Sequence, residues 1–177
     1  CGCFGIRFLG CVDHWAEENF VHDIGPGDPD NRNGNRVYGI STNRVYGNTT
    51  TDILPDGTVN PEITTIYRRA ENAWFCRNRV YNCKSWKGLD THGGKNINLI
   101  DNHVTDCHIG IGIDMAGYLE RHGYVRVEDI KITGNTVERY LPDQSYEGNA
   151  IEDERYACAA AGINVGAKDE SYDGNAS

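Results

Sequence analysis

The sequence lacks long hydrophobic runs and has few positive charges. No apolar run approaches the roughly 18 residues that a membrane-spanning helix requires. Lys and Arg number 17 against 26 Asp and Glu, which gives a formal net charge of −9. This excess of acidic residues argues against a nucleic acid or an anionic membrane surface as a partner, because both require clustered Lys and Arg. Neutral polymers and ligands bridged by cations remain compatible with the charge.

The sequence also lacks paired cysteine motifs. Its seven cysteines include no CxxC pair, whereas a disulfide framework or a zinc site usually shows an even count or closely paired spacings. The N-terminal CGC is a less favoured candidate for a metal or redox pair. We interpret the cysteines as small buried hydrophobic residues. Free cysteines favour folding in a reducing compartment, as for a phage particle protein assembled in a host cytoplasm.

The length is sufficient for one sizeable core but too short for two full domains. We therefore expect residues 1–177 to form a single domain. The 21 glycines and many Asn and Asp residues favour short strands and frequent turns over a helical bundle. The N-terminal CGCFGIRFLG contains no initiator Met, no basic start and no long apolar run, so we expect a piece of a longer protein.

A repeated pattern of asparagine, any residue and valine runs through the chain. Its copies are NFVHDI, NRVYGN, NRVYNC, NHVTDC and NTVERY, which begin at Asn19, Asn43, Asn78, Asn102 and Asn135, and a sixth copy begins at Asn175. The steps from Asn19 to Asn43 and from Asn78 to Asn102 are both 24 residues, and the other steps are longer. A basic unit of this length with insertions is typical of a solenoid.

Short segments of alternating polarity lie on both sides of these asparagines. The residues five and three positions before the asparagine are apolar in four copies: Tyr38 and Ile40, Ala73 and Phe75, Ile97 and Leu99, Ile130 and Ile132. Further alternating segments, KGLDT, GIGID and AGINV, follow the asparagine turn. This alternation is typical of strands with one buried face. It predicts an all-β, right-handed parallel β-helix solenoid of about six coils with loop insertions, and both ends fall inside a coil.

Stacked coils would align equivalent residues into ladders. The five asparagines are expected to form a ladder of hydrogen-bonded side-chain amides. Cys83, Cys107 and Tyr140 fall at the same point of successive coils, where earlier copies have Ile24 and Asn48. We interpret this set as an interior ladder, not a disulfide.

The segment GLDTHGG, residues 88–94, places an acid and a histidine just before two glycines. Aligning Leu89 with Ile113 as one interior row sends Asp90 and Asp114 outward on adjacent coils. Two stacked carboxylates repel, so partial burial should raise one pKa toward a value useful for acid or base chemistry. His92 points outward beside them and can titrate near neutrality. The alternative interpretation is that Asp90 caps a surface turn and that His92 has no role in binding or catalysis.

Two predicted loops supply candidate substrate-binding residues near these carboxylates. Residues 117–128 leave the strand that contains Asp114, and residues 141–160 enter just before the third strand of their own coil. Loops placed by a rigid solenoid are common sites of function. The candidates are Arg121, His122, Tyr124, Arg126, Glu152, Glu154 and Arg155.

The asparagine coils resemble the right-handed β-helix superfamily of pectate lyases, mannuronan C5-epimerases and phage tailspike depolymerases, which share the pectin lyase fold. The resemblance covers the chain from Asn19 to its end. GLDTH is similar to the Y-G-F-D-P-H motif of the epimerases, in which Asp, His and Tyr serve the chemistry at C5. It implicates Asp90 and His92, and it places Lys87 at the tyrosine position. The resemblance also implies a polysaccharide partner, a homotrimer as in many tailspikes, and an extracellular or virion-associated location.

These observations predict a protein that binds and cleaves a polysaccharide in a groove on one face of the solenoid. Hydrolysis would use the two aspartates, with Glu152 or Glu154, as acid and base. Elimination, or uronate C5 epimerisation, would use His92 or Lys87 as the base and an arginine to neutralise the uronate carboxylate. We assign no metal ligands, although Ca²⁺ could bridge a uronate polymer to the acidic surface. A non-catalytic glycan-binding or structural fibre module is the remaining alternative.

Overall fold

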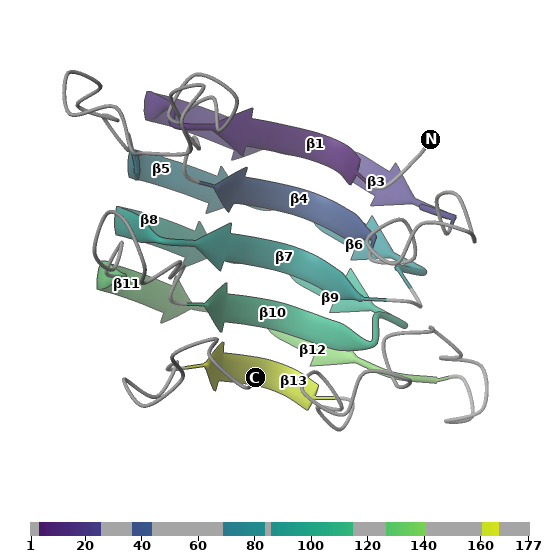
Figure 1. Ribbon diagram of the computed structural model, residues 1–177. Coiled ribbons are helices and arrows are strands. Elements are labelled where there is room, and N and C mark those ends of the chain that lie inside the picture. The colour runs from purple at the N-terminus through teal and green to yellow at the C-terminus, as the bar shows by residue number, and fades with distance from the viewer. Residues whose placement is uncertain are drawn as a thin grey trace, which may run out of the picture.

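The computed structural model describes residues 4–25, 37–43, 69–83, 86–114, 127–140 and 161–166. These residues contain thirteen strands and no helix, in three sheets whose neighbouring strands all pair in parallel (Figure 1). No helix able to cross a membrane occurs in this part of the chain. Stacked parallel strands in three sheets confirm the all-β prediction and are consistent with a β-helix solenoid.

Each sheet takes every third strand of the chain, in sequence order. Sheet A contains β1 (Phe4–Leu9), β4 (Tyr38–Asn43), β7 (Lys87–His92), β10 (Ile109–Asp114) and β13 (Ala161–Gly166). Sheet B contains β2 (Val12–Glu17), β5 (Ala70–Cys76), β8 (Gly94–Ile100) and β11 (Glu128–Thr133). Sheet C contains β3 (Phe20–His22), β6 (Arg79–Tyr81), β9 (His103–Thr105) and β12 (Thr136–Glu138). Figure 1 shows the strands of sheet A one above another, in front of the other two sheets.

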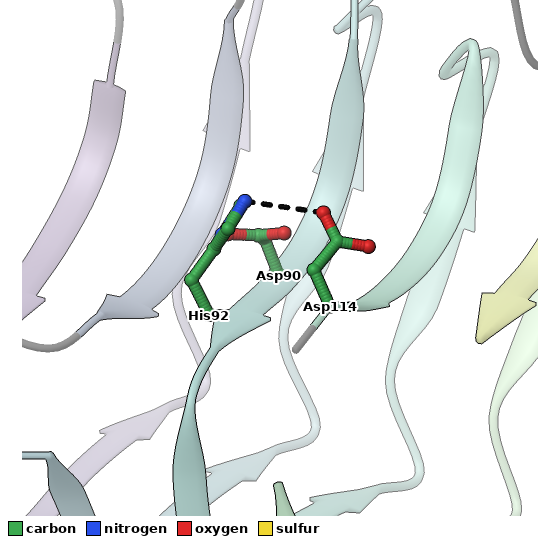
Figure 2. Close-up of side chains that lie close together, drawn as sticks. All are labelled: Asp90, His92 and Asp114. Atoms are coloured by element: carbon green, nitrogen blue, oxygen red, sulfur yellow. Dashed lines mark hydrogen bonds and ion pairs between the residues drawn. The ribbon is translucent and has the colours of Figure 1, made fainter. Parts of the chain in front are cut away.

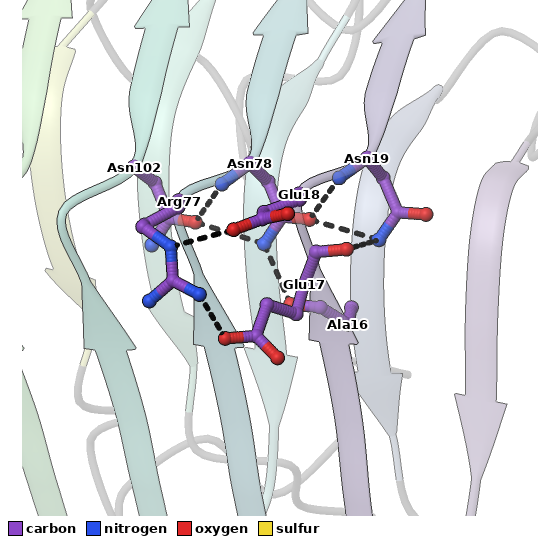
Figure 3. A network of polar contacts seen from close by, with 7 residues as sticks. All are labelled: Ala16, Glu17, Glu18, Asn19, Arg77, Asn78 and Asn102. Carbon is purple, nitrogen blue, oxygen red and sulfur yellow. Dashed lines mark hydrogen bonds and ion pairs between the residues drawn. The ribbon is translucent and has the colours of Figure 1, made fainter.

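An asparagine ladder joins the turns between sheets B and C, and it involves Asn19, Asn78, Asn102 and Asn135. The Oδ1 atom of each later member accepts hydrogen bonds from the backbone N–H and the Nδ2 of the member before it, at 2.8–3.1 Å. Each later Nδ2 also donates to a carbonyl of the preceding coil, as from Asn78 to Ala16 at 2.7 Å (Figure 3). Every coil is therefore tied to the next by side-chain and backbone hydrogen bonds.

Asn43 does not belong to this ladder, and that prediction was wrong. Asn43 is the last residue of β4, where it pairs in register with His92 of sheet A. The step from Asn19 to its ladder neighbour Asn78 is therefore 59 residues, not two shorter steps. The pattern N-x-V-x fits the end of a strand as well as a turn, because both positions accept asparagine beside an apolar residue. The count of about six coils included this copy.

The core lies between the three sheets and is built from the apolar residues of the alternating pattern. Ala73, Phe75, Ile97 and Leu99 are fully buried, as the alternation before the asparagines predicts. Valines from sheet C pack against the same cluster. The segments KGLDT, GIGID and AGINV are strands of sheet A, also as predicted. The repeated sequence thus forms its core with one face of every strand.

The interior ladder of cysteines is only partly correct. Cys83 and Cys107 are buried free thiols, and Ile24 is buried in the same core. A hydrogen bond with Cys107, together with burial, raises the pKa of the Cys83 thiol. Tyr140 is 70% exposed, so its inclusion was wrong. Its backbone N–H donates to Asp106 at 2.7 Å, and its hydroxyl bonds with Glu138 on the outside. The remaining position, Asn48, lies outside the described residues.

Candidate functional site

The register of sheet A differs from the predicted alignment by two residues. Leu89 pairs with Ile111, not with Ile113, and Asp90 pairs with Gly112. Asp114 therefore lies beside His92, and the two aspartates are not stacked as direct partners. On the next strand Ile113 pairs with Val165. The error arose from matching GLD with GID, which equates the wrong glycines.

A glycine at the second position of each sheet A strand shows the true register. The five strands contain Gly5, Gly39, Gly88, Gly110 and Gly162, and each glycine is followed by Ile or Leu. A Cβ atom on Gly88 would lie 2.4 Å from Val104 Cγ1 and 2.8 Å from the Gly110 carbonyl oxygen. The backbone passes so close to the core and to the next coil that only glycine fits. This repeat is the sequence signal that fixes the alignment.

Asp90, His92 and Asp114 lie on the outer face of sheet A, because they alternate with Leu89, Ile111 and Ile113, which occupy the core. The Lys87 side chain reaches the same outer face, where its Nζ meets Asp90 and Asp114. Outward orientation does not make them all accessible. The Asp90 and Lys87 side chains are 0% and 1% exposed, whereas those of His92 and Asp114 are 26% and 27% exposed. Of these four side chains, only those of His92 and Asp114 are therefore partly exposed to a ligand.

Four charged side chains form a closed network, which we call the Lys-His-Asp cluster: Lys87, Asp90, His92 and Asp114. Lys87 Nζ donates to Asp90 Oδ1 at 2.8 Å and to Asp114 Oδ2 at 2.5 Å. His92 Nδ1 lies 2.6 Å from Asp90 Oδ2, and its Nε2 lies 3.1 Å from Asp114 Oδ2. Figure 2 shows Asp90 and His92 rising from one strand and Asp114 from the next, with the imidazole turned toward Asp114.

Gly112 provides the space in which Lys87 reaches from one strand to the next. A Cβ atom at Gly112 would lie 2.5 Å from Lys87 Cδ and 3.0 Å from Nζ. The Lys87 side chain therefore crosses from β7 over Gly112 of β10 and reaches Asp114, which is also in β10. The GIGID sequence of β10 thus contributes both the second aspartate and the space for its cation.

The charges in the cluster favour its ionised forms. Burial acts to lower the pKa of Lys87, but the charges of Asp90 and Asp114 outweigh it and raise that pKa. Burial likewise opposes protonation of His92, but the Asp90 charge and hydrogen bonds to both carboxylates raise the pKa of the imidazole. Burial favours the neutral form of Asp114, yet its bonds to His92 and the Lys87 charge hold its pKa well below the usual range. The predicted upward shift is therefore wrong for Asp114, because the hydrogen bond from His92 and the charge of Lys87 stabilise the ionised carboxylate.

The same groups could be considered as metal ligands. One ligand atom from each of Asp90, His92 and Asp114 lies within 4.8 Å of the others. The Lys87 ammonium, however, already bonds to both carboxylates and supplies the positive charge that a metal ion would bring. A cation at this position would have to displace Lys87, so the residues present do not fit a resident metal ion. We assign none to the cluster.

The seven predicted substrate-binding residues lie outside the described residues. They are Arg121, His122, Tyr124, Arg126, Glu152, Glu154 and Arg155. The sequence interpretation omitted two residues of β4 that lie near the cluster. Tyr38 approaches His92 edge-on, with ring centroids 6.0 Å apart, and Ser41 pairs in register with Asp90. The alternation of β4 places Ser41 on the outer face, but this was recognisable only with the correct register.

The cluster is expected to stabilise the fold most between about pH 4 and pH 6.5. The raised pKa of His92 gives a contribution that is complete below its unfolded pKa and is lost as the pH rises through its folded value. The lowered pKa of Asp114 gives a contribution that is present above its unfolded pKa and is lost as the pH falls through its folded value. Urea unfolding of the wild type and His92→Gln across this range measures the effect. Their difference in unfolding free energy should shrink above neutral pH, and a difference independent of pH would contradict the assignment.

Comparisons of the chain with models of protein families, with curated proteins and with solved structures find no match. The class that the fold and the site define is therefore an all-β protein of stacked parallel strands, with a partly buried charge cluster on the outer face of one sheet. Its function has to be argued from this cluster.

Proposed function

We propose that this chain is a carbohydrate-active, right-handed parallel β-helix protein of the pectate lyase-like superfamily. On this proposal it binds an acidic polysaccharide on the outer face of sheet A and cleaves it by β-elimination. The fold proposal is supported by the recurrence of three sheets in sequence order and by the asparagine ladder between sheets B and C. The resemblance of GLDTH to the epimerase motif supports the location of the site.

The observation that carries the proposal is the partly buried Lys-His-Asp cluster. Burial of charged groups is costly and is tolerated when they are paired, and such clusters gather at functional sites. The fold does not require charged residues at these positions, because β4 has the uncharged Ser41 and Asn43 at the equivalent outer positions. The cluster leaves His92 and Asp114 partly open while the other two groups are closed off. This division is suited to one accessible reacting group, His92, that buried groups hold in position.

The geometry favours elimination over hydrolysis. A hydrolase requires a protonated acid and a base separated by about 5 Å or more, so that the sugar and the attacking group fit between them. The two accessible groups here are 3.1 Å apart, and the pKa of Asp114 is lowered, not raised. Asp90 has no exposed surface. A single proton-transferring group on one side of the sugar is sufficient for elimination.

The proposed roles follow from these contacts. Asp90 orients the imidazole through Nδ1, and neutral His92 takes the proton α to the uronate carboxylate at Nε2. The electron pair of the broken C–H bond forms the new double bond as the glycosidic C–O bond breaks. The imidazolium then returns its proton to the leaving oxygen. Lys87 bonds to both aspartates, so it is a positioning residue, and its raised pKa makes it a poor base.

The test incubates the full chain with a panel of neutral and uronate polysaccharides and follows both reducing ends and the ultraviolet absorbance of an unsaturated uronate. We expect both signals from a uronate polymer, with a rate that rises with pH through the raised pKa of His92. His92→Gln should lower the rate at least about 100-fold. His103→Gln is the matched control, because that exposed histidine also pairs with a carboxylate, Glu138 at 2.7 Å, but lies on sheet C.

Other outcomes select the alternatives. Reducing ends without absorbance would indicate a hydrolase, and exchange of the C5 hydrogen with solvent without cleavage would indicate a uronate C5-epimerase. The absence of both signals with every polymer, from a folded protein, would indicate a glycan-binding or fibre module. Ca²⁺ bridging the acidic surface to the polymer and assembly as a homotrimer belong to the same proposal. Repeating the assay with a chelator and measuring the sedimentation of the chain test these two points.

A further inference from the structure

The outer face of sheet A continues beyond the Lys-His-Asp cluster onto β4 and β1. Arg7 pairs in register with Ser41, and Ser41 pairs with Asp90. In the next outward row Asn43 pairs with His92. Neighbouring strands are about 4.8 Å apart, a step comparable to the length of one sugar ring. A sugar adjacent to one at the cluster would therefore lie over these positions.

Two polar atoms of β4 next to the cluster have no hydrogen-bond partner. Ser41 Oγ and Asn43 Oδ1 are both buried and unpaired, and the two residues are 0% and 8% exposed. Buried polar groups are nearly always paired, because leaving one unsatisfied costs about 1–3 kcal/mol. Ligand hydroxyls that enter beside the partly open His92 would supply the missing partners. This deficit is what a binding position for a polyhydroxylated ring would show.

An aromatic surface joins these residues to an exposed cation. The Tyr38 ring approaches His92 edge-on, and Phe4 stacks on Tyr38 with centroids 4.8 Å apart and planes 5° apart. The guanidinium carbon of Arg7 lies 4.1 Å from the centre of the Phe4 ring. Arg7 is exposed, and no described carboxylate forms an ion pair with it. Arg7 is thus a positioned cation that remains available to an anionic group.

We infer that Arg7, Ser41 and Asn43 form a second sugar-binding subsite, which takes an acidic sugar adjacent to the one held at the cluster. Arg7 binds the carboxylate of that sugar, and Ser41 and Asn43 bind its hydroxyls. The polysaccharide then runs across the strands of sheet A from β10 toward β1. This inference rests on the proposed function for the identity of the ligand, but it concerns binding and does not depend on turnover.

The test measures equilibrium binding of a defined uronate oligosaccharide and of a neutral oligosaccharide of equal length by calorimetry. The full chain carries His92→Gln so that turnover does not consume the ligand. Three further changes are compared in this background: Arg7→Gln, Asn43→Leu and Ser41→Ala. Arg79→Gln is the matched control, since Arg79 is an exposed arginine of β6 in sheet C. Each variant is checked by circular dichroism and urea unfolding.

We expect Arg7→Gln to weaken binding of the uronate oligosaccharide about tenfold. The control Arg79→Gln should leave this binding unchanged. Asn43→Leu should weaken it by a similar factor while stabilising the unliganded fold, because an unpaired polar atom is removed. Equal binding of the uronate oligosaccharide by all these variants would overturn the inference, even if the wild type cleaves the polymer. No binding of it by the His92→Gln chain would also overturn it. Binding that depends on Arg7, without turnover in the wild type, would support the subsite and reject the proposed elimination.

Discussion

Replacing Lys87 with methionine is expected to lower the free energy of unfolding by about 3–5 kcal/mol, the usual cost of breaking a buried ion pair. The methionine retains most of the side-chain volume beside Gly112 but leaves Asp90 with no exposed surface and without its lysine partner. Urea unfolding at neutral pH measures the change. Lys95→Met is the matched control, because Lys95 is 44% exposed and lies 4.0 Å from Glu128, and surface pairs contribute about 0–1 kcal/mol.

A second substitution identifies the cause of the loss. Adding Asp90→Asn to Lys87→Met removes the buried carboxylate that has lost its lysine partner and keeps only His92, so part of the lost stability should return. Additive losses from the two substitutions would mean that Lys87 stabilises the fold through packing and not through charge. A loss no larger than that of Lys95→Met would show that the cluster is open to water, and it would remove the main support for the proposed site.

Replacing Asn102 with leucine is expected to cost about 3 kcal/mol or more, because each buried polar group left unpaired costs about 1–3 kcal/mol. Asn102 Oδ1 accepts from the backbone N–H and Nδ2 of Asn78, and its own Nδ2 donates to the Phe75 carbonyl and to Asn135. The substitution leaves Asn78 and the Phe75 carbonyl without these partners on one neighbouring coil, and it removes one of the two hydrogen bonds to Asn135 Oδ1 on the other. Denaturant unfolding followed by circular dichroism gives the value.

Asn19→Leu provides the comparison at the end of the described ladder. Asn19 donates to Asn78 and to the Glu17 carbonyl, and its side chain accepts no ladder hydrogen bond from another described asparagine. Its loss should therefore cost less, about 1–2 kcal/mol. Equal losses of unfolding free energy in Asn19→Leu and Asn102→Leu would contradict the view that an asparagine between two coils is stabilised by hydrogen bonds to both of them.

The period of the sequence determined the all-β class and most of the strands. Residues such as Phe75, Leu99 and Leu89 alternate with polar neighbours, and alternation places them on one buried face in any sheet. The asparagines at 19, 78, 102 and 135 were recognisable because a turn that repeats in every coil requires the same side chain each time. Asn43 shows where this reasoning fails, since a short motif does not distinguish a turn from a strand end.

The composition of the cluster was also predictable, but its chemistry was not. Strand alternation assigns Asp90, His92 and Asp114 to outward positions, and the resemblance to the epimerase motif singles out Lys87. Which of them meet depends on the register, and a shift of two residues moved Asp114 from Asp90 to His92. The repeated glycines of sheet A indicate the correct register. The reason for their repetition is visible only in the structure, where a Cβ atom on Gly88 would clash with Val104 of another sheet.

The sequence by itself determined that short strands repeat, which faces are apolar and which residues could react, because these properties are local and periodic. Only the tertiary structure decided that Lys87 lies between two carboxylates, that Asp90 is closed to water and that His92 faces Asp114. Ionisation and access depend on neighbours one coil away, 22 to 27 residues distant in the chain. The sign of a pKa shift follows from those neighbours, and no local pattern records them.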